Sequence, residues 1–374
     1  MMYIIILIKY IFSQTKYKYI CDLDEVKHYK KYCGSNYASI PQHENYKLKK
    51  LMVFFRHGDR APLKMNANKW KDEHCKVCNT KKTLKSNRLV ECNIEKCDDG
   101  MLSLKGFEQM EKLGKFLKEE YFSEKDFDEK DIEYNCTNVP RAKASLAAMH
   151  KGLKGTIVIE KINIKPLVDD PMISRKDCPM HIRIMNKSLK HLLPEKIPAT
   201  TVSTDFDNYL THLCNNIPLN CNKISCDKNK IIEYLNSSFK VWKEQNDTAV
   251  HNERILQYTF GRLANEILKK LKTKTPIHIF SSHDGTLSSL LNGLGTKVQE
   301  HTPYASAIFI EIWEHGNDKN KKDYARIIFN DKVCQTTIDK STNIPLKKFI
   351  EYLKVLRIRN ESELKNSCND IFEI

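Results

Sequence analysis

The sequence lacks an apolar run of the roughly 20 residues that a helix needs to cross a bilayer. The N-terminal stretch Met1–Phe12 is apolar apart from Lys9, and it is too short for a comfortable span. Such a stretch is typical of a signal-peptide core, with Ser13 as a small residue at a cleavage site. A short N-terminal membrane anchor is the alternative. We therefore expect residues 1–20 to be one of these two and to direct the chain into the secretory pathway.

The sequence also lacks any Lys/Arg stretch interleaved with aromatic residues on a recognisable nucleic-acid module, so nucleic acid is not an expected partner. The chain is nevertheless basic, with 62 Lys and Arg against 47 Asp and Glu and a net charge of +15. A basic surface attracts anionic substrates or polyanions such as proteoglycans at long range. A general bias toward Lys, Asn and Ile would give the same charge without such a partner, and both interpretations stay open.

Cysteine, by contrast, is abundant. Thirteen cysteines and five Asn-x-Ser/Thr sequons predict a disulfide-bonded glycoprotein of an oxidising compartment. The group Cys75, Cys78, Cys92 and Cys97 begins with Cys-x-x-Cys and could bind zinc, but disulfides are the preferred interpretation. We expect Cys368 to tie the C-terminal tail to the body. The sequons lie at Asn135, Asn186, Asn236, Asn246 and Asn360.

The main functional signal is the sequence Arg56-His57-Gly58-Asp59-Arg60-Ala61-Pro62. It follows Leu51–Phe55, five apolar residues that predict a buried strand of a parallel sheet. Two guanidinium groups flanking a histidine on a glycine turn favour binding of a phosphate dianion. A neutral imidazole is a good nucleophile toward a phosphoryl group, and neighbouring arginines disfavour its protonation.

Two further strand and turn units carry polar residues at the ends of their strands. Arg141 follows the predicted strand 132–137 and precedes an Ala-rich helix. His283 and Asp284 follow the strand 277–280, and Asp284 also suits the N-cap of the next helix. Ligands of open α/β sheets bind outside the carboxyl ends of the strands, so we expect the three units to converge on one site.

The pattern of elements predicts an α/β fold, a mostly parallel sheet flanked by helices with an inserted smaller, mainly helical cap domain. Residues 46–150 and 251–374 form the α/β domain, with helices expected over 104–121, 255–271 and 346–358 and antiparallel strands over 307–313 and 324–330. Residues 151–250, rich in proline and cysteine, form the cap. The cysteine-containing stretch 75–97 shows no sustained periodicity and is interpreted as a disulfide-tethered loop in the pocket wall.

These motifs resemble the histidine acid phosphatase family (branch 2), whose signature Arg-His-Gly-x-Arg-x-Pro is matched at every fixed position by residues 56–62. The resemblance implies that His57 is the nucleophile and Asp284 the proton donor. It implies that Arg56, Arg60, Arg141 and His283 bind the phosphate. We expect Asp59 to orient Arg60 rather than to act in catalysis. No metal or other cofactor is needed, because the arginines supply the positive charge.

The stretches 282–288 and 310–313 and the cysteines between 214 and 226 resemble family members of the Golgi that remove the 2-phosphate from xylose in the glycosaminoglycan linkage region. A phosphorylated sugar is therefore the expected substrate. One alternative is a broad-specificity acid phosphatase that is secreted or lysosomal. A phosphoglycerate mutase would share the Arg-His-Gly start, but sequons and many cysteines argue against it. An inactive, glycan-binding protein of the same fold would be expected to lose His57 or Asp284, and both are present.

Overall fold

Strand β1 (Tyr46–Arg56) lies at the centre of the sheet and leads directly into the Arg-His-Gly sequence. Its side chains alternate between two hydrophobic clusters. Val53 and Phe55 join one cluster, whereas Met52 and Phe54 join the other. Because successive side chains of a strand point to opposite faces, five consecutive apolar residues require a layer of helices on each side.

The structure is a computed structural model that describes residues 28–40, 46–65, 68–82, 87–122, 129–173, 178–180, 183, 199–219, 227–250, 252–296, 298, 301–315 and 322–369. Within these ranges, no helix is both long enough and apolar enough to cross a membrane. The predicted signal peptide or anchor at residues 1–20 lies outside the described residues, as do Cys21, Asn186, Cys221 and Cys226.

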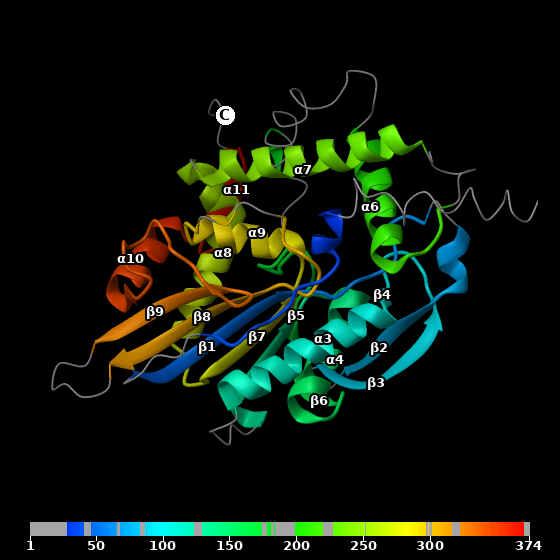
Figure 1. Cartoon of the computed structure of the whole chain (residues 1–374). Helices are drawn as coiled ribbons and strands as arrows, with labels where there is room; N and C mark the ends of the chain where they lie inside the picture. Colours follow the sequence, from blue (N-terminus) through cyan, green and yellow to red (C-terminus); the bar gives the residue numbers. More distant parts are fainter. Residues whose placement is uncertain are drawn as a thin grey trace, which may run out of the picture.

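The sheet of the described residues has eleven strands and mixed topology (Figure 1). Three more strands, β5 (Ile132–Cys136), β6 (Ile159–Ile164) and β7 (Ile277–Ser282), run parallel to β1 in the spatial order β1-β7-β5-β6. Antiparallel strands extend this core on both sides. Beyond β1 lie β8 (Ala307–His315), β9 (Asp323–Phe329), β10 (Lys332–Val333) and β11 (Ile344–Pro345). Beyond β6 lie β3 (Asn87–Lys96), β2 (His74–Lys82) and β4 (Leu102–Ser103).

The α/β class is confirmed, but only the central four strands are parallel to one another. Antiparallel strands near the C-terminus were expected, whereas the stretch predicted as a loop unexpectedly adds the antiparallel β2–β3 hairpin. Two disulfides join this hairpin, Cys78–Cys92 at directly paired positions and Cys75–Cys97 at its base. The disulfide interpretation of these four cysteines is therefore confirmed, and zinc binding by them is excluded. The hairpin escapes sequence analysis because cross-links replace the alternating apolar side chains that usually identify a strand.

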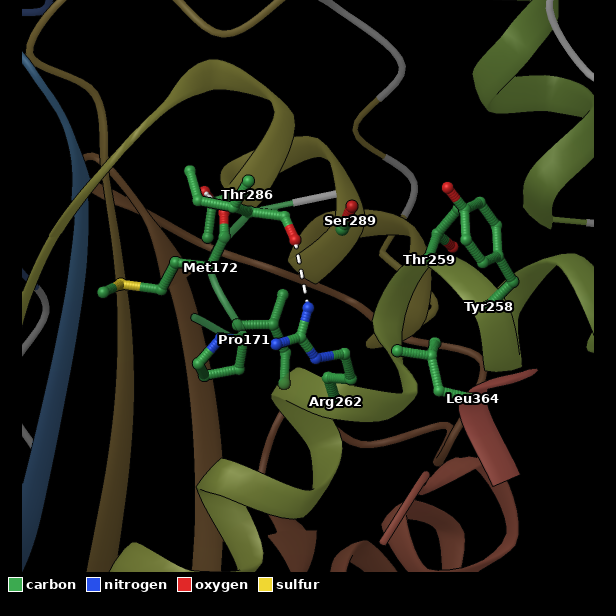
Figure 2. Close-up of a pocket in the computed structure, with 10 residues that line it drawn as sticks. Pro171, Met172, Tyr258, Thr259, Arg262, Thr286, Ser289 and Leu364 are labelled. Atoms are coloured by element: carbon green, nitrogen blue, oxygen red, sulfur yellow. Dashed lines mark hydrogen bonds between the residues drawn. The ribbon is translucent and has the colours of Figure 1, made fainter. Parts of the chain in front are cut away.

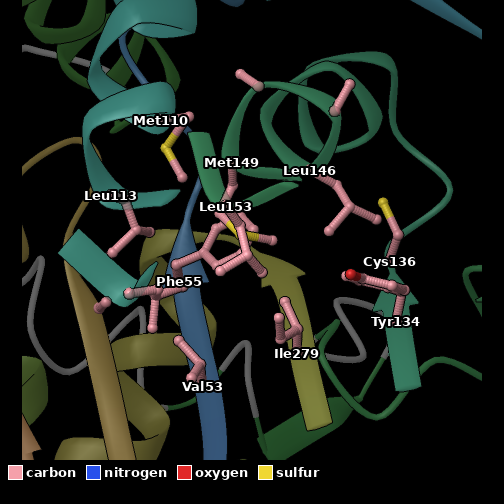
Figure 3. Close-up of a cluster of buried hydrophobic side chains, with 14 of the residues drawn as sticks. Val53, Phe55, Met110, Leu113, Tyr134, Cys136, Leu146, Met149, Leu153 and Ile279 are labelled. Carbon is pink, nitrogen blue, oxygen red and sulfur yellow. The ribbon is translucent and has the colours of Figure 1, made fainter. Parts of the chain in front are cut away.

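Helices cover both faces of the sheet (Figure 1). On the first face, α3 (Leu104–Leu117) and α4 (Pro140–Lys154) pack on the cluster that contains Val53 and Phe55. Figure 3 shows the side chains that fill this layer, among them Met110, Leu113, Met149, Leu153 and Ile279. On the second face lie α8 (Glu253–Leu271), α9 (Asp284–Gly293) and α10 (Leu346–Leu356). Each fully buried Leu, Ile or Phe in these layers contributes about 1.5–3 kcal/mol to folding.

The remaining helical elements of the described residues are short. The helix α11 (Glu361–Asn369) packs on α8. Three 3₁₀ turns, η1 (His28–Tyr32), η2 (Asn68–Asp72) and η4 (Glu129–Asp131), and the π-helical turn η3 (Lys118–Phe122) lie between the longer elements. The three helices predicted over 104–121, 255–271 and 346–358 are confirmed with shifted ends. The antiparallel strands predicted over 307–313 and 324–330 are confirmed as the pair β8 and β9.

The predicted cap contains two long helices, α6 (Ala199–Asn215) and α7 (Lys228–Val250). Figure 1 shows α7 crossing above α8 and α9, on the side of the sheet edge where the parallel strands end. Residues 159–164, which the sequence assigned to the cap, form β6 of the sheet instead. The helical part of this region therefore begins after β6.

Two disulfides tie distant segments to the body. Cys33, after η1, is bonded to Cys214 of α6, and Cys178 is bonded to Cys368, so the predicted attachment of the tail is confirmed. Cys136 and Cys334 are buried free thiols. Four disulfides are consistent with the secretory pathway. Of the sequon asparagines, Asn236 and Asn360 are exposed, whereas Asn135 and Asn246 are buried and unsuited to glycosylation.

Candidate active site

The three predicted units meet at the carboxyl ends of neighbouring parallel strands. Arg56 is paired in register with Ser282 of β7, and Cys136 of β5 is paired with Ser281. Each strand therefore ends at the same edge of the sheet. The structure brings all six predicted residues together there, from the β1 turn, the start of α4 and the start of α9: Arg56, His57, Arg60, Arg141, His283 and Asp284.

His57 is buried, and its backbone is fixed on both sides. Its N–H donates to the carbonyl of Ser282 (3.1 Å), and its carbonyl accepts from the N–H of Ala305 (3.1 Å). The ring Nδ1 lies 2.9 Å from the Gly58 carbonyl, which can only accept, so Nδ1 carries the proton and Nε2 keeps its lone pair. Burial and then the cation of Arg141 lower the pKa of His57 well below its usual range. The ring is therefore neutral even in mild acid, with an unprotonated Nε2.

The turn around His57 depends on two glycines that let α3 approach it closely. A Cβ on Gly58 would lie 2.2 Å from the carbonyl oxygen of Gly106, and a Cβ on Gly106 would lie 2.0 Å from that of Asp59. Ser103 caps α3 by accepting from the Gly106 N–H (3.0 Å), and serine is among the residues that helix N-caps favour. Helix α3 thereby holds the turn that carries His57.

Arg56 connects three parts of the site. One terminal nitrogen donates to the Thr302 carbonyl (2.5 Å), and the other lies 3.3 Å from Oδ2 of Asp284. Its guanidinium also stacks on the ring of Tyr304, 4.1 Å from the centroid. Thr302 and Tyr304 lie more than 240 residues from Arg56. No local pattern marks these two residues as part of the site.

Asp284 occupies the first turn of α9 rather than its N-cap, which is His283. The sequence prediction of an Asp284 cap is therefore wrong by one residue, because β7 extends to Ser282 and the turn is shorter than expected. Burial is the largest single effect and would raise the pKa of Asp284, but Arg56 and the neighbouring cationic groups together outweigh it, and the pKa lies well below its usual range. The side chain remains 41% exposed, so it faces the space that a substrate would enter.

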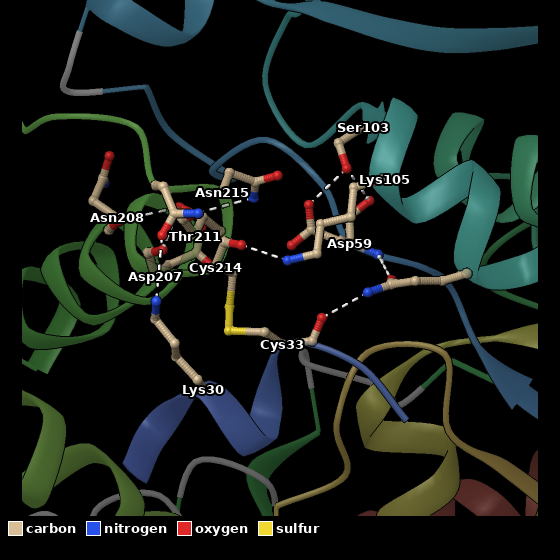
Figure 4. Close-up of a disulfide and its surroundings, with 12 residues drawn as sticks. Lys30, Cys33, Asp59, Ser103, Lys105, Asp207, Asn208, Thr211, Cys214 and Asn215 are labelled. Atoms are coloured by element: carbon tan, nitrogen blue, oxygen red, sulfur yellow. Dashed lines mark hydrogen bonds between the residues drawn. A yellow bond between two sulfur atoms is a disulfide. The ribbon is translucent and has the colours of Figure 1, made fainter. Parts of the chain in front are cut away.

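Arg60 pairs with a residue that the sequence analysis did not identify. Its two terminal nitrogens donate to the carboxylate of Asp207 in α6, at 3.2 and 2.8 Å. Asp59, the expected partner, instead accepts from Ser103 (2.6 Å), and its N–H donates to Gln109 (2.9 Å). Figure 4 shows Asp59 and Ser103 together, apart from Asp207. The expectation for Asp59 is wrong because its side chain turns toward α3.

Arg141 lies in the first turn of α4. Its Nε is buried and has no hydrogen-bond partner among the described residues. Burial, and next the nearby Arg60 cation, lower the pKa of Arg141 to about 10. Arginines held together in this way repel each other unless an anion lies between them. The arrangement suits a phosphate dianion.

His283 is oriented by Thr137, the residue after β5, and the start of its helix is held by the segment beneath α9. Its Nε2 lies 2.9 Å from Oγ1 of Thr137, and burial followed by the Arg141 cation lowers its pKa to about 3. The start of α9 rests on the segment 171–173 (Figure 2). Thr286 donates to the Met172 carbonyl (2.7 Å), and Arg262 of α8 donates to the Ile173 carbonyl (3.3 Å). The imidazole is therefore a neutral, fixed hydrogen-bonding group.

Comparison with known proteins agrees with this geometry. The model of the "Histidine phosphatase superfamily (branch 2)" matches residues 47–240, which include Arg56, His57, Arg60 and Arg141. The chain is 25% identical to 2-phosphoxylose phosphatase 1 of Xenopus tropicalis, over 86% of this chain and 78% of the relative. It is 23% identical to the Homo sapiens protein of the same name, over 46% of this chain and 40% of the relative.

Solved structures of phytases share the fold. The phytase of D. castellii superposes with a TM-score of 0.54 at 15% identity, covering 89% of this chain and 85% of the phytase. The phytase of Hafnia alvei in complex with tartrate superposes with a TM-score of 0.53 at 14% identity, covering 85% of this chain and 100% of the phytase. The family model spans more than half of the 374 residues. The protein therefore belongs to branch 2 of the histidine phosphatase superfamily and is a phosphomonoester hydrolase.

Proposed function

We propose that the protein hydrolyses a sugar phosphate through a phosphohistidine intermediate on His57. The lone pair of Nε2 attacks the phosphorus, and the bond from phosphorus to the ester oxygen breaks. Asp284 gives its proton to that oxygen, which leaves as an alcohol. Water then attacks the phosphohistidine, Asp284 takes a proton from the water, and phosphate and neutral His57 are regenerated. Two moderate barriers replace one high barrier.

The observation that carries this proposal is a buried, neutral His57 beside three guanidinium groups. Arg56, Arg60 and Arg141 bind the phosphoryl oxygens and stabilise the charge that they carry during transfer. His283 adds a hydrogen bond from a fixed ring. Since Nδ1 of His57 is held by the Gly58 carbonyl, only Nε2 is available for attack.

The proton donor must be protonated when substrate is bound, although the arginines lower its pKa in the substrate-free site. A phosphate dianion offsets the charge of Arg56 and repels a carboxylate. Binding of substrate therefore raises the pKa of Asp284 and favours its acid form. Once it has protonated the departing alcohol, Asp284 is a carboxylate and is ready to accept the proton of the water that attacks the phosphohistidine.

We infer a substrate of the 2-phosphoxylose type from the names of the two relatives. Such a substrate would occur on proteoglycan precursors in the Golgi, reached through the N-terminal leader or anchor. The net charge of +15 favours the approach of an anionic glycan. The exposed Asp284 leaves room for a leaving group larger than water.

The test is phosphate release at mildly acidic pH from a xylose-2-phosphorylated linkage glycan and from p-nitrophenyl phosphate. We expect a strong preference for the glycan and loss of both activities in His57→Ala. His74→Ala, on an exposed histidine of β2, is the matched control and should keep both. Equal activity on both substrates would favour a broad-specificity acid phosphatase. Folded wild-type protein that releases no phosphate would contradict the proposal.

A further inference from the structure

His301 lies in the segment 301–306, which forms one wall of the site before β8. The next residue, Thr302, accepts a hydrogen bond from Arg56 (2.5 Å), and the Tyr304 ring stacks on the same guanidinium. Ala305 donates to the His57 carbonyl (3.1 Å). The segment therefore belongs to the active site, yet the two-step mechanism gives His301 no task.

The orientation of the His301 ring is fixed. Its Nδ1 lies 3.1 Å from the Thr302 carbonyl, which only accepts, so Nδ1 carries the proton and Nε2 presents a lone pair. Three aromatic rings surround the imidazole, with centroid distances of 5.6 Å for Tyr32, 5.6 Å for Phe239 and 5.3 Å for Trp242. Tyr32 belongs to η1, and the other two belong to α7. His301 thus joins the helical cap to the catalytic centre.

Arg56 links the His301 segment to the proposed proton donor, because it donates to the Thr302 carbonyl (2.5 Å) and lies 3.3 Å from Oδ2 of Asp284. Burial and then the Arg56 cation lower the pKa of His301 to about 4, whereas Asp284 acts in the opposite sense. His301 in turn is one of the groups that lower the pKa of Asp284. The imidazole is therefore neutral in mild acid and contributes no full charge to phosphate binding. What His301 offers at this wall of the site is a hydrogen-bond acceptor.

We propose that Nε2 of His301 accepts a hydrogen bond from a leaving-group hydroxyl on the carbon next to the ester oxygen. The enzyme then selects phosphomonoesters of vicinal diols, the arrangement found in sugars. This inference rests on the proposed function of the same site. Asp284 protonates the ester oxygen, and His301 accepts a hydrogen bond from the hydroxyl on the adjacent carbon. In xylose 2-phosphate, the matching hydroxyl is the one at C3.

The experiment compares kcat/KM for methyl β-D-xyloside 2-phosphate and for its 3-deoxy analogue. We expect wild type to prefer the hydroxylated substrate about 10-fold, the effect of one hydrogen bond with a partner that is otherwise left unpaired. His301→Phe keeps a flat ring among the three aromatics but has no acceptor. Its preference should fall to about one, through slower reaction of the hydroxylated substrate.

Two further variants support the interpretation. His301→Gln places an amide oxygen near the position of Nε2 and should restore part of the preference. His74→Phe changes an exposed histidine of β2 and should leave the preference unchanged. Circular dichroism and melting curves verify that each variant is folded.

Equal kcat/KM of wild type for the two xylosides would overturn the role of His301 and leave the phosphatase mechanism intact. An equal loss on both substrates in His301→Phe would also overturn it, because a lost hydroxyl contact affects only one of them. Wild-type protein that hydrolyses neither xyloside would instead contradict the proposed function itself. The two failures are thus distinguishable.

Discussion

Asp207 of α6 forms a bidentate ion pair with Arg60, in the turn after β1, with nitrogen to oxygen distances of 3.2 and 2.8 Å. The same carboxylate accepts from the Leu63 N–H (2.7 Å). Arg60 is only 4% exposed, so the pair is shielded from solvent. A residue of the helical cap thereby fixes the direction of a guanidinium in the proposed phosphate site.

We predict that Asp207→Asn lowers kcat/KM about 10- to 100-fold, because an amide cannot hold both nitrogens of Arg60 and small misplacements are costly in phosphoryl transfer. The measurement is steady-state kinetics together with inhibition by inorganic phosphate. Asp205→Asn, on the same helix, is the matched control and should behave as wild type. Tighter phosphate inhibition in Asp207→Asn would contradict the prediction, since Asp207 would then compete with phosphate rather than position Arg60.

The Cys33–Cys214 bond supports the same helix from its other end. Cys214 lies two turns after Asp207, and Lys105 of α3 donates to the Cys214 carbonyl (Figure 4). Cys33 and Cys214 are separated by 181 residues in the sequence, whereas Cys78 and Cys92 of the hairpin are separated by 14 residues. One bond therefore constrains the active-site wall, and the other constrains a hairpin of the sheet.

We predict that replacing Cys33 and Cys214 by serine lowers the free energy of unfolding by about 2–5 kcal/mol and also raises KM. Replacing Cys78 and Cys92 should cost about 3 kcal/mol and leave KM unchanged. Chemical denaturation and kinetics on the same preparations test both statements. An unchanged KM in the first variant would show that α6 keeps its position without the bond.

Much of this fold could be predicted from the sequence, because its core elements carry strong local patterns. The apolar runs of β1 and β7 and the periodicity of α3 and α8 are visible in single segments. Residues at the ends of parallel strands then converge for topological reasons. The six predicted site residues come together in this way.

The parts that the sequence did not reveal depend on contacts between distant segments. Asp207 lies 147 residues from Arg60, and nothing near it in sequence distinguishes it from Asp205. Asp59 looked like the natural partner of Arg60 because it is adjacent, yet its side chain bonds to Ser103. The β2–β3 hairpin lacks an alternating pattern because disulfides stabilise it. Adjacency in the sequence therefore did not predict which carboxylate contacts Arg60.

Glu133 gives a prediction for the pH dependence of stability. Burial would raise its pKa, but contacts with His278 (3.1 Å) and Lys270 (2.5 Å) outweigh this, and the pKa falls from 4.5 to about 2. The folded state therefore binds this proton more weakly than the unfolded state. The resulting stabilisation is complete above pH 4.5 and is lost as the pH falls toward 2.

We expect Glu133→Gln to lower the free energy of unfolding by about 2 kcal/mol at pH 6 and by progressively less below pH 4.5. Denaturant titrations between pH 6 and pH 3 measure the difference. Glu160→Gln on β6, where the partner Arg88 is 42% exposed, should have little effect at any pH. If the difference in free energy of unfolding between wild type and Glu133→Gln stayed constant down to pH 3, the pH dependence of stability could not be attributed to the Glu133 carboxylate.

The role of Asp284 can be tested through the leaving group. An alcohol oxygen needs a proton to depart, whereas p-nitrophenolate leaves without one. We predict that Asp284→Asn lowers kcat for a xyloside 2-phosphate by about 10²- to 10⁴-fold and lowers formation of the phosphoenzyme from p-nitrophenyl phosphate much less. Because the second step also needs Asp284 as a base, the aryl substrate should give a burst of one p-nitrophenol per site, followed by slow turnover.

Rapid-quench measurements with both substrates separate the two steps, and mass spectrometry detects phosphate on His57. His57→Ala should give neither burst nor phosphoprotein. An equal loss of the first step on both substrates in Asp284→Asn would mean that Asp284 acts through Arg56, 3.3 Å away, by holding the guanidinium rather than by donating a proton. Arg56→Lys would then show the same uniform loss, because lysine cannot contact Thr302, Asp284 and the phosphate in the same fork geometry.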